Sequence, residues 1–322
     1  MIYSSLFACY FRRNMRIALF TLFFFGGALG LSAQIELTYG DSPQSLAEQI
    51  TGNGVQILNP VITCHDSAIG TFVIPSSINF PPNKGVILST GNINGLLGPN
   101  DTEAHTTVWN TPGDPLITQI GGQTSFDACA LEFDIVPAGD TLRFDFTFAS
   151  EEYDEYVGTP FNDIFAFFIS GPGIVGDPGM GGRENIALIP NTNTPVGIST
   201  VNDGNPDIGF PPTNAQYFHR NPLSMSAPIQ FDGWTKGLYA EKVVQPCDTF
   251  RLKLVIADVA DPKWDSAVLI EAIESNTITL SAETQEGIES TIEGCNPGTV
   301  TFTRSPVTSN PATVTFFVQG TA

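Results

Sequence analysis

The residues with the clearest chemical potential lie near the middle of the chain. Four carboxylates occur within five residues, in a segment that we call the first acidic turn: Glu151, Glu152, Asp154 and Glu155. Asn162 and Asp163 follow a few residues later, and an apolar run, residues 164–169, comes directly after them. Carboxylates beside buried strands are costly unless they are paired, protonated or bound to a metal ion. This segment is therefore the first candidate for a functional site.

A second group of carboxylates follows another predicted strand and forms the second acidic turn, with Asp258, Asp261 and Asp265. If the two strands are neighbours, both turns open at the same end of a sheet. Calcium takes about six to eight oxygen ligands from carboxylates, amides and carbonyls in turns. The sequence therefore predicts a Ca²⁺ site drawn from eight residues: Glu151, Glu152, Asp154, Asn162, Asp163, Asp258, Asp261 and Asp265.

A structural interpretation of the same residues stays open beside the calcium hypothesis. The spacing of the second acidic turn does not match an EF-hand loop, so no calcium-binding motif supports the site directly. In this second interpretation the carboxylates cap turns and form ion pairs with Arg183, Lys263 or Arg251.

The adjacent Glu151 and Glu152 also raise the hypothesis of a secreted hydrolase that acts on polysaccharide. Neighbouring residues of a strand point to opposite faces, whereas the two carboxyls of a glycosidase flank one bond at about 5–9 Å from each other. The three histidines, His65, His105 and His219, lack the spacing of a metal site. The chain also has no nucleophile elbow and no phosphate-binding loop. We therefore predict a non-catalytic module and keep the hydrolase as the alternative.

Aromatic side chains near the acidic turns are candidates for ligand binding. Trp264 lies inside the second acidic turn, and Tyr153 is interleaved with the carboxylates of the first. Exposed aromatic rings beside acidic and amide groups suit the recognition of a sugar, and we expect a surface glycan or a protein as the ligand. The alternative is that each tryptophan plugs the edge of a β-sandwich.

The composition restricts the fold and the class of partner. The chain of 322 residues contains 31 glycines, 24 prolines and 24 phenylalanines, but only 14% charged residues. Short strands joined by turns fit this composition better than a helical bundle does. The net charge of −20 argues against a nucleic-acid partner, which requires a basic face.

The hydrophobic pattern predicts an all-β fold. Apolar and polar residues alternate over 131–135 and 142–148, which predicts a β-hairpin with one buried face. The run 165–169 has no alternation and predicts a central strand covered on both faces. Residues 43–50 predict one short helix, whereas 92–124 reads as a long surface loop. We expect a jelly-roll-like antiparallel β-sandwich with long loops.

The termini indicate export and a second module. Residues 1–33 carry an arginine-rich start, a short apolar run and small residues before Gln34, which is typical of a signal peptide. No later stretch is apolar enough to span a membrane. From about residue 276 the composition changes, and 276–322 is predicted to be the start of a second β-sandwich module that is truncated. Four cysteines follow the signal peptide, with no pairing readable from the sequence: Cys64, Cys129, Cys247 and Cys295.

Several segments resemble the choice-of-anchor L domain family. They occur in consistent order between about 42 and 275: residues 148–153 (FASEEY), 161–163 (FND), 167–173 (FFISGPG) and 185–190 (NIALIP). We therefore place the main domain at residues 34–275. The piece that contains Cys295 and residues 300–302 resembles, over a short length, the start of a Calx-β-like adhesin repeat.

The resemblance implies a secreted or cell-surface protein of a kind typical of Bacteroidota, for which type IX secretion is a common route, and a place within a larger multi-modular protein. It implies no enzymatic activity. The function predicted from the sequence is thus a non-catalytic module for adhesion or ligand binding, stabilised by calcium.

Overall fold

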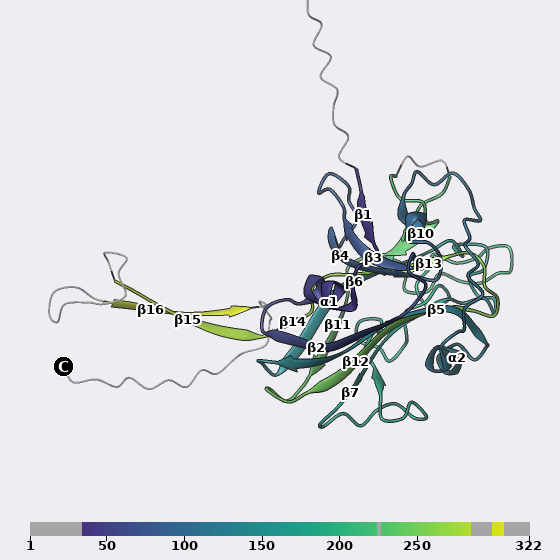
Figure 1. The fold of residues 1–322 in the computed structure, drawn as a ribbon. Coiled ribbons are helices and arrows are strands. Elements are labelled where there is room, and N and C mark those ends of the chain that lie inside the picture. The colour runs from purple at the N-terminus through teal and green to yellow at the C-terminus, as the bar shows by residue number, and fades with distance from the viewer. Residues whose placement is uncertain (1–33, 224–226, 285–297, 306–322) are drawn as a thin grey trace, which may run out of the picture. The chain divides into compact units, whose positions relative to one another are not determined.

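The computed structural model describes residues 34–223, 227–284 and 298–305. Two antiparallel sheets pack face to face in this part of the chain (Figure 1). The jelly-roll-like β-sandwich expected from the sequence is confirmed. No helix among the described residues is long and apolar enough to cross a membrane.

The first sheet contains nine strands. Its main path runs through seven of them in this order: β1 (Glu36–Tyr39), β3 (Ile69–Val73), β4 (Lys84–Ser89), β13 (Ser266–Ile270), β6 (Thr141–Ser150), β10 (Gly233–Thr235) and β9 (Phe218–Arg220). Two further strands also pair with β6: β11 (Leu238–Val243) and β14 (Glu274–Ser275). Strand β6 therefore lies at the centre of this sheet.

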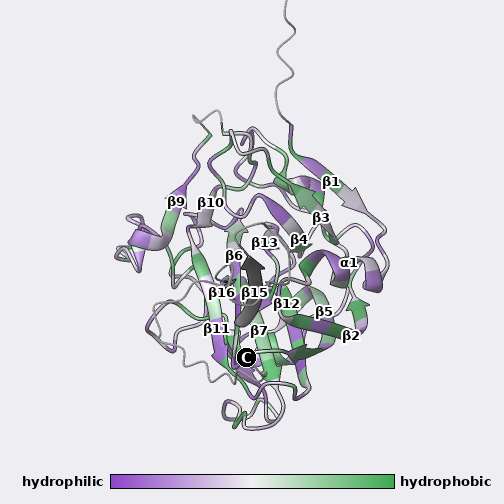
Figure 2. Ribbon diagram, turned by 90° about the vertical axis from the view of Figure 1, so that its left-hand side faces the viewer, coloured by the Kyte–Doolittle hydropathy of each residue, from purple (hydrophilic) through white to green (hydrophobic). Residues whose placement is uncertain are grey.

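The second sheet has five strands. Their order is β2 (Val55–Thr63), β5 (Ser125–Pro137), β12 (Phe250–Val259), β7 (Ile164–Ser170) and β8 (Glu184–Asn185). The two long strands β5 and β12 pair antiparallel along their length. The register shifts once, at a bulge between Ile256 and Asp258. Figure 2 shows hydrophobic colour along β5, β12 and β7.

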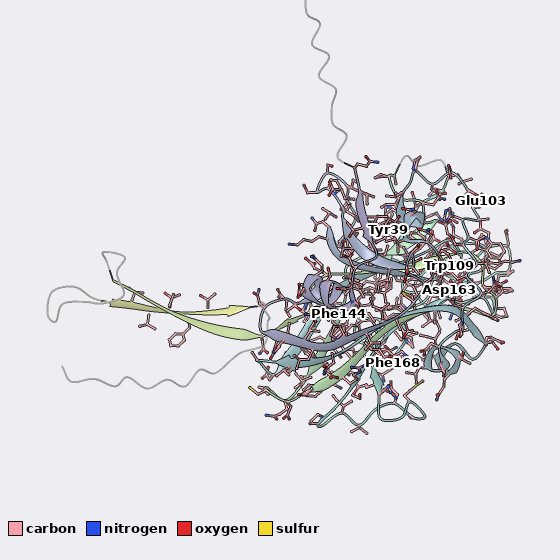
Figure 3. All side chains as sticks on the ribbon, viewed as in Figure 1. Tyr39, Glu103, Trp109, Phe144, Asp163 and Phe168 are labelled. Carbon is pink, nitrogen blue, oxygen red and sulfur yellow. A yellow bond between two sulfur atoms is a disulfide. The ribbon has the colours of Figure 1, made fainter. Side chains whose placement is uncertain are left out.

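Phenylalanines fill the space between the sheets. Phe144 of β6 stacks on Phe167 of β7 with ring centroids 3.8 Å apart, and Phe146 contacts Phe165 at 5.3 Å. All four side chains are at most 2% exposed. Figure 3 labels Phe144 within this core. The alternating pattern of β6 is explained by this packing, because every second side chain points into the layer between the sheets.

The predicted hairpin of residues 131–135 and 142–148 is wrong in its pairing. Both segments are strands, but β5 pairs with β2 and β12 in the second sheet, whereas β6 belongs to the first sheet. The connection 138–140 carries the chain from one sheet to the other. Alternation reports which face of a strand is buried and does not report which strand lies beside it.

Strand β7 is covered on both faces, as its continuous apolar sequence predicted. One face packs into the core between the sheets, and the other packs under helix α2 (Pro115–Gly121). This helix lies in the stretch expected to be a surface loop. Asp114 caps its first turn through Leu116 N at 2.8 Å and also accepts from Lys253 Nζ at 2.6 Å.

The predicted N-terminal helix is confirmed as α1 (Pro43–Ile50), with Ser42 as its N-cap. Two 3₁₀ turns, η1 (Ile93–Leu96) and η2 (Ala215–Tyr217), occur in the long loops. Strands β15 (Thr277–Thr284) and β16 (Gly298–Ser305) form a separate two-stranded sheet. The signal peptide and the predicted strand 314–318 lie outside the described residues, so the second module stays a prediction.

The structure pairs Cys64 with Cys129 in a disulfide between β2 and β5, and Cys247 is an exposed free thiol. Cys295 lies outside the described residues. Disulfides persist in oxidising compartments, so this bond fits an exported protein.

We expect Phe167→Ala to lower the free energy of unfolding by about 3–5 kcal/mol, because it removes a fully buried ring from the centre of the core. Urea unfolding of the purified protein measures this change. Val175→Ala is the control, since Val175 is 92% exposed and its loss should change the value by less than about 0.5 kcal/mol. Equal effects of the two substitutions would contradict the assignment of the core.

Candidate functional site

Five carboxylates meet between the two sheets at one end of the sandwich, and we call them the acidic cluster: Glu151, Glu152, Asp163, Asp258 and Asp265. None of them is more than 1% exposed. Figure 3 shows Asp163 toward the right-hand end of the sandwich. Asp163 and Asp258 belong to the second sheet, and the other three follow or precede strands of the first.

The strand registers explain why the two acidic turns meet. In the first sheet β13 lies beside β6, with Ser266 opposite Ser150, and Glu151 N donates to Asp265 O at 3.0 Å. In the second sheet β12 lies beside β7, with Ala257 opposite Ile164. Four strand ends thus place their flanking acids in one small volume.

Part of the acidic cluster is fixed by hydrogen bonds. Asp163 N donates to Glu152 Oε2 at 3.1 Å. The carboxylate of Asp163 accepts from Val259 N at 2.9 Å and from Ser266 Oγ at 2.7 Å. Ser266 Oγ also lies 2.8 Å from Ser150 Oγ. These bonds tie the two sheets together and hold Asp163 in one orientation.

Other oxygens of the cluster make no well-formed hydrogen bond. These are both side-chain oxygens of Glu151 and of Asp258 and Asp265 Oδ2, although Thr90 lies beside Asp258, and His105 and Gln230 lie beside Glu151. His105 Nδ1 lies 3.7 Å from that oxygen of Asp265. A Cβ atom at position 91 would overlap the Asp265 carboxylate, so only Gly91 leaves room for it. Unpartnered buried carboxylate oxygens indicate that a proton or a cation is missing from the site.

Of the basic residues that were expected to pair with the turns, Lys263 lies in the second acidic turn, where its charge opposes the raised pKa of Asp261. Arg251 pairs with Glu132 and Asp134 on the second sheet. No ion pair to lysine or arginine reaches Glu151, Glu152, Asp163 or Asp258 within the described part of the chain. The acidic cluster therefore has no counter-charge from these side chains.

Burial dominates the proton affinity of the cluster. It raises the pKa of Glu151 to about 10, with the charges of Asp232 and Asp265 adding to the effect. It raises the pKa of Asp163 to about 8, although the bonds from Ser266 and Val259 oppose the shift. The pKa values of Glu152 and Asp258 are also raised well above the ordinary range, first by burial and next by Asp163. Without a cation, these groups hold protons at neutral pH.

Three members of the predicted calcium set lie outside the cluster. Asp154 forms an ion pair with Arg220. Asn162 Oδ1 accepts from Ser199 N at 2.9 Å. Asp261 Oδ1 accepts from Lys263 N at 3.1 Å, so this residue caps its own turn as the structural interpretation expected.

The sequence did not indicate two polar groups beside the cluster. Thr90 Oγ1 accepts from Ser266 N at 2.9 Å and lies next to Asp258. Among the charged groups, Asp232 contributes most to the raised pKa of Glu151. Both stand in stretches without an acidic pattern, and only the strand registers bring them to the site.

Three half-buried rings form an aromatic patch on the two acidic turns: Tyr156, Phe161 and Trp264. Tyr156 contacts Trp264 with centroids 4.6 Å apart and Phe161 at 5.4 Å. Trp264 is thus accessible beside the cluster. Tyr153, the other predicted ligand residue, is 1% exposed and donates its hydroxyl to Val201 O at 2.9 Å. Its ring packs on Phe218, a position that serves the core rather than a ligand.

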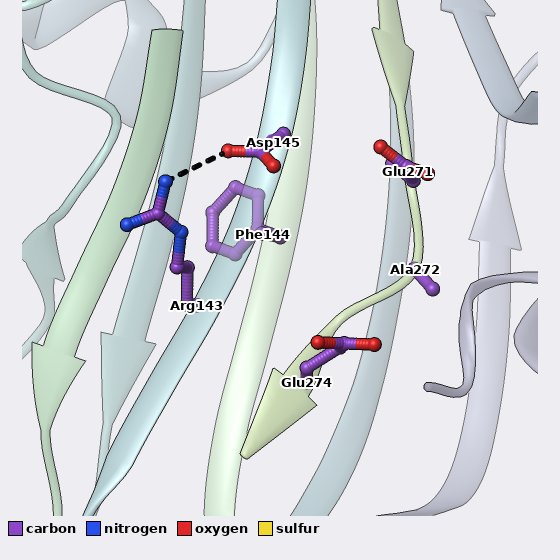
Figure 4. Close-up of a pocket in the computed structure, with 6 residues that line it drawn as sticks. All are labelled: Arg143, Phe144, Asp145, Glu271, Ala272 and Glu274. Carbon is purple, nitrogen blue, oxygen red and sulfur yellow. Dashed lines mark hydrogen bonds and ion pairs between the residues drawn. The ribbon is translucent and has the colours of Figure 1, made fainter. Parts of the chain in front are cut away.

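The cluster does not form a finished metal site in this arrangement. In the described ranges, no group of three or more histidine, cysteine, aspartate or glutamate side chains is placed so that it could hold a metal ion. A cavity of about 170 Å³ lies elsewhere, between Arg143, Asp145 and Glu271, and contains none of the cluster residues (Figure 4). Side-chain rotation would be needed for a cation to bind in the cluster.

The sequence model of the choice-of-anchor L domain matches residues 36–276. The chain belongs to the choice-of-anchor L family. The matched range covers the whole sandwich, including both acidic turns and the aromatic patch. Membership implies a secreted or surface protein.

Among solved structures, TmCBM61 in complex with β-1,4-galactotriose matches with 12% sequence identity. The match covers 67% of this chain and 86% of that chain, with a TM-score of 0.27. No curated protein matches the sequence.

We expect the calcium-free protein to lose stability as the pH rises from about 4.5 toward 8. The folded state keeps protons on Glu151 and Asp163 that the unfolded chain releases above its ordinary carboxyl pKa, so each retained proton lowers stability by about 1.4 kcal/mol per pH unit. Asp258→Asn should make this dependence shallower, because it removes one of the titrating groups. Urea unfolding in EDTA at several pH values measures both slopes.

Asp207→Asn is the matched control for this experiment. Asp207 is exposed, and its hydrogen bond is to Asn205, which is not a residue of the cluster. The substitution should leave the slope unchanged. A stability that rises with pH over this window in the parent protein would contradict the raised pKa values.

Proposed function

We propose that the domain is a non-catalytic ligand-binding module of a secreted or cell-surface protein, and that calcium bound in the acidic cluster stabilises its loop end. The observation that carries the proposal is the burial of five carboxylates between two sheets, four of which have no basic partner in the described residues, whereas His105 lies 3.7 Å from Asp265. A divalent cation replaces protons at such a site and supplies the missing charge.

The residues present fit a calcium ion in their chemistry. Asp258 is the first candidate ligand, because its two oxygens are buried beside other carboxylates and make no well-formed hydrogen bond. Asp163, Glu152 and Asp265 would add carboxylate oxygens, and Thr90 would add a hydroxyl. Calcium accepts such mixed oxygen sets with irregular geometry, which reduces the rearrangement required.

The alternative of a polysaccharide hydrolase loses its main support. Glu151 is 0% exposed and Glu152 is 1% exposed, so the carboxylates that motivated it are not within reach of a polymeric substrate. Glu152 also accepts a bond from Asp163 N. These placements favour a binding role over a catalytic one.

The aromatic patch is the surface that we propose for the ligand. Tyr156 and Trp264 belong to the two acidic turns that the cluster holds, so a cation in the cluster would fix the patch as well. Aromatic faces bordered by a few polar groups are the ordinary lining of binding sites. A surface glycan is the ligand that we favour, with a protein ligand as the alternative. The Bacteroidota origin, the type IX route and the adhesin repeat stay predictions.

We expect calcium to raise the melting temperature of the domain relative to EDTA. A ligand that binds only the folded state adds about 2.7 kcal/mol when its concentration is one hundred times Kd. Asp258→Asn should lose most of this gain, because it removes a charged ligand while keeping the shape of the side chain. Differential scanning calorimetry and calcium titration calorimetry measure the two effects.

Asp207→Asn should respond to calcium like the parent protein. Identical melting of the parent protein in calcium and in EDTA, together with no heat of calcium binding, would leave the cluster as a set of protonated carboxyls and refute the calcium proposal.

We expect Trp264→Ala to abolish binding on a glycan array run in calcium while changing the melting temperature little, since the side chain is half-buried at the surface. Tyr39→Ala is the control, because Tyr39 is an exposed aromatic residue on the edge strand β1. Equal glycan binding by the parent protein and Trp264→Ala would exclude the patch as the binding surface.

A further inference from the structure

A cavity of about 270 Å³ lies beside the first acidic turn and has an unusual balance of charge. We call it the acidic cavity, and eight residues line it: Glu103, Tyr153, Asp154, Glu155, Arg220, Pro222, Leu223 and Asp232. Four of them are acids and one is a base. Figure 3 labels Glu103, which is exposed on this side of the domain.

The single arginine of the acidic cavity is already engaged. Arg220 Nε lies 3.1 Å from Asp203 Oδ2, and Arg220 Nη2 pairs with Asp154 Oδ2. Its charge is therefore shared between two carboxylates, one of which lies outside the lining. The remaining acids of the cavity, including Asp232, receive no ion pair from it.

Asp232 is a deeply buried acid in the lining of the cavity. This residue is 7% exposed, and its Oδ1 accepts from Asn100 Nδ2 at 2.6 Å. Its Oδ2 is buried and has no hydrogen-bond partner among the described residues. Asp154 and Asp232 come from different loops and line one cavity, and carboxylates on two sides of a cavity suit a hydrogen-bonding cation.

The size and the walls of the cavity indicate an organic cation. Its volume is several times the about 30 Å³ that one water occupies in the liquid, so a single bare ion would leave most of it empty. Pro222 and Leu223 form an apolar wall, and Leu223 is 44% exposed. A lysine-like group combines an apolar stem with an ammonium that donates three hydrogen bonds.

We propose that the acidic cavity binds the ammonium group of an aliphatic amine, with Asp232 and Asp154 as its acceptors and with Leu223 and Pro222 against its stem. The source is either the lysine side chain of a partner protein or a free diamine. None of the five residues of the acidic cluster and none of the three rings of the aromatic patch lines this cavity, and Glu151 of the cluster lies near Asp232.

The proton affinity of Asp232 agrees with the proposal. Burial raises the pKa of Asp232 to about 7, and the charges of Glu155 and Glu103 add to the effect. Asp232 is therefore partly protonated at neutral pH. A bound ammonium favours the ionised carboxylate and lowers this pKa.

Titration calorimetry tests this site with four probes: Nα-acetyl-lysine methylamide, 1,5-diaminopentane, Nα,Nε-diacetyl-lysine methylamide and calcium chloride. We expect the first two to bind and the diacetylated amide, which has no charge, to give no heat. Tighter binding of the lysine amide identifies a protein partner as the source, and tighter binding of the diamine identifies a free amine.

Asp232→Asn should weaken amine binding about tenfold or more, since it removes one charge-assisted hydrogen bond. The asparagine keeps the bond from Asn100, so the fold should persist. Leu223→Ala should weaken the lysine amide through loss of the apolar wall. Asp207→Asn and Asp258→Asn are controls that should bind amines like the parent protein.

Three results would overturn the proposal: no saturable binding of either amine at millimolar concentration, unchanged amine binding in Asp232→Asn, or calcium binding that Asp232→Asn removes without any amine binding. The Asp258→Asn control separates this outcome from failure of the calcium proposal, because Asp258 belongs to the acidic cluster and does not line the acidic cavity.

Discussion

The cost of burying negative charge between two apolar sheets is the constraint on which the rest of this structure depends. Isolated buried carboxylates are unfavourable by several kcal/mol each, so a cluster of five must take up protons or a cation. The ends of β6, β7, β12 and β13 are all fixed around this cluster. The loop end of the sandwich is consequently linked to the chemical state of its carboxyls, whereas the phenylalanine core at Phe144 and Phe167 is not.

The sandwich supplies the rigidity that this arrangement needs. Hydrogen bonds from Val259 N and Ser266 Oγ hold Asp163 between the sheets, one from each layer. Tyr156 and Trp264 leave the same two turns and meet at the surface. The aromatic patch therefore stands on the same two turns that carry the buried carboxylates.

The acidic cluster and the acidic cavity are connected through one side chain. Glu151 is buried between Asp265 of the cluster and Asp232 of the cavity, and both charges raise its pKa. Neutralising either neighbour reduces the repulsion that Glu151 experiences. A cation in the cluster and an ammonium in the cavity would thus each favour the ionised form of the same residue, so that the two sites act on a shared group without sharing a ligand.

The sequence by itself determined the fold class, helix α1, the double-sided burial of β7 and the presence of two acidic turns. These features follow from local periodicity, capping residues and composition, which act over a few neighbouring residues. Only the tertiary structure decided that β5 and β6 lie in different sheets. The alternation of apolar and polar residues indicates the buried face of a strand but does not indicate its partner strand. The tertiary structure also decided which acids converge: Asp258 joins Asp163 through the β12–β7 register, whereas Asp261 remains in its turn. The burial of Tyr153 and the position of Asp232 beside Glu151 were also decided by the tertiary structure. Both depend on contacts between segments that are far apart in the chain.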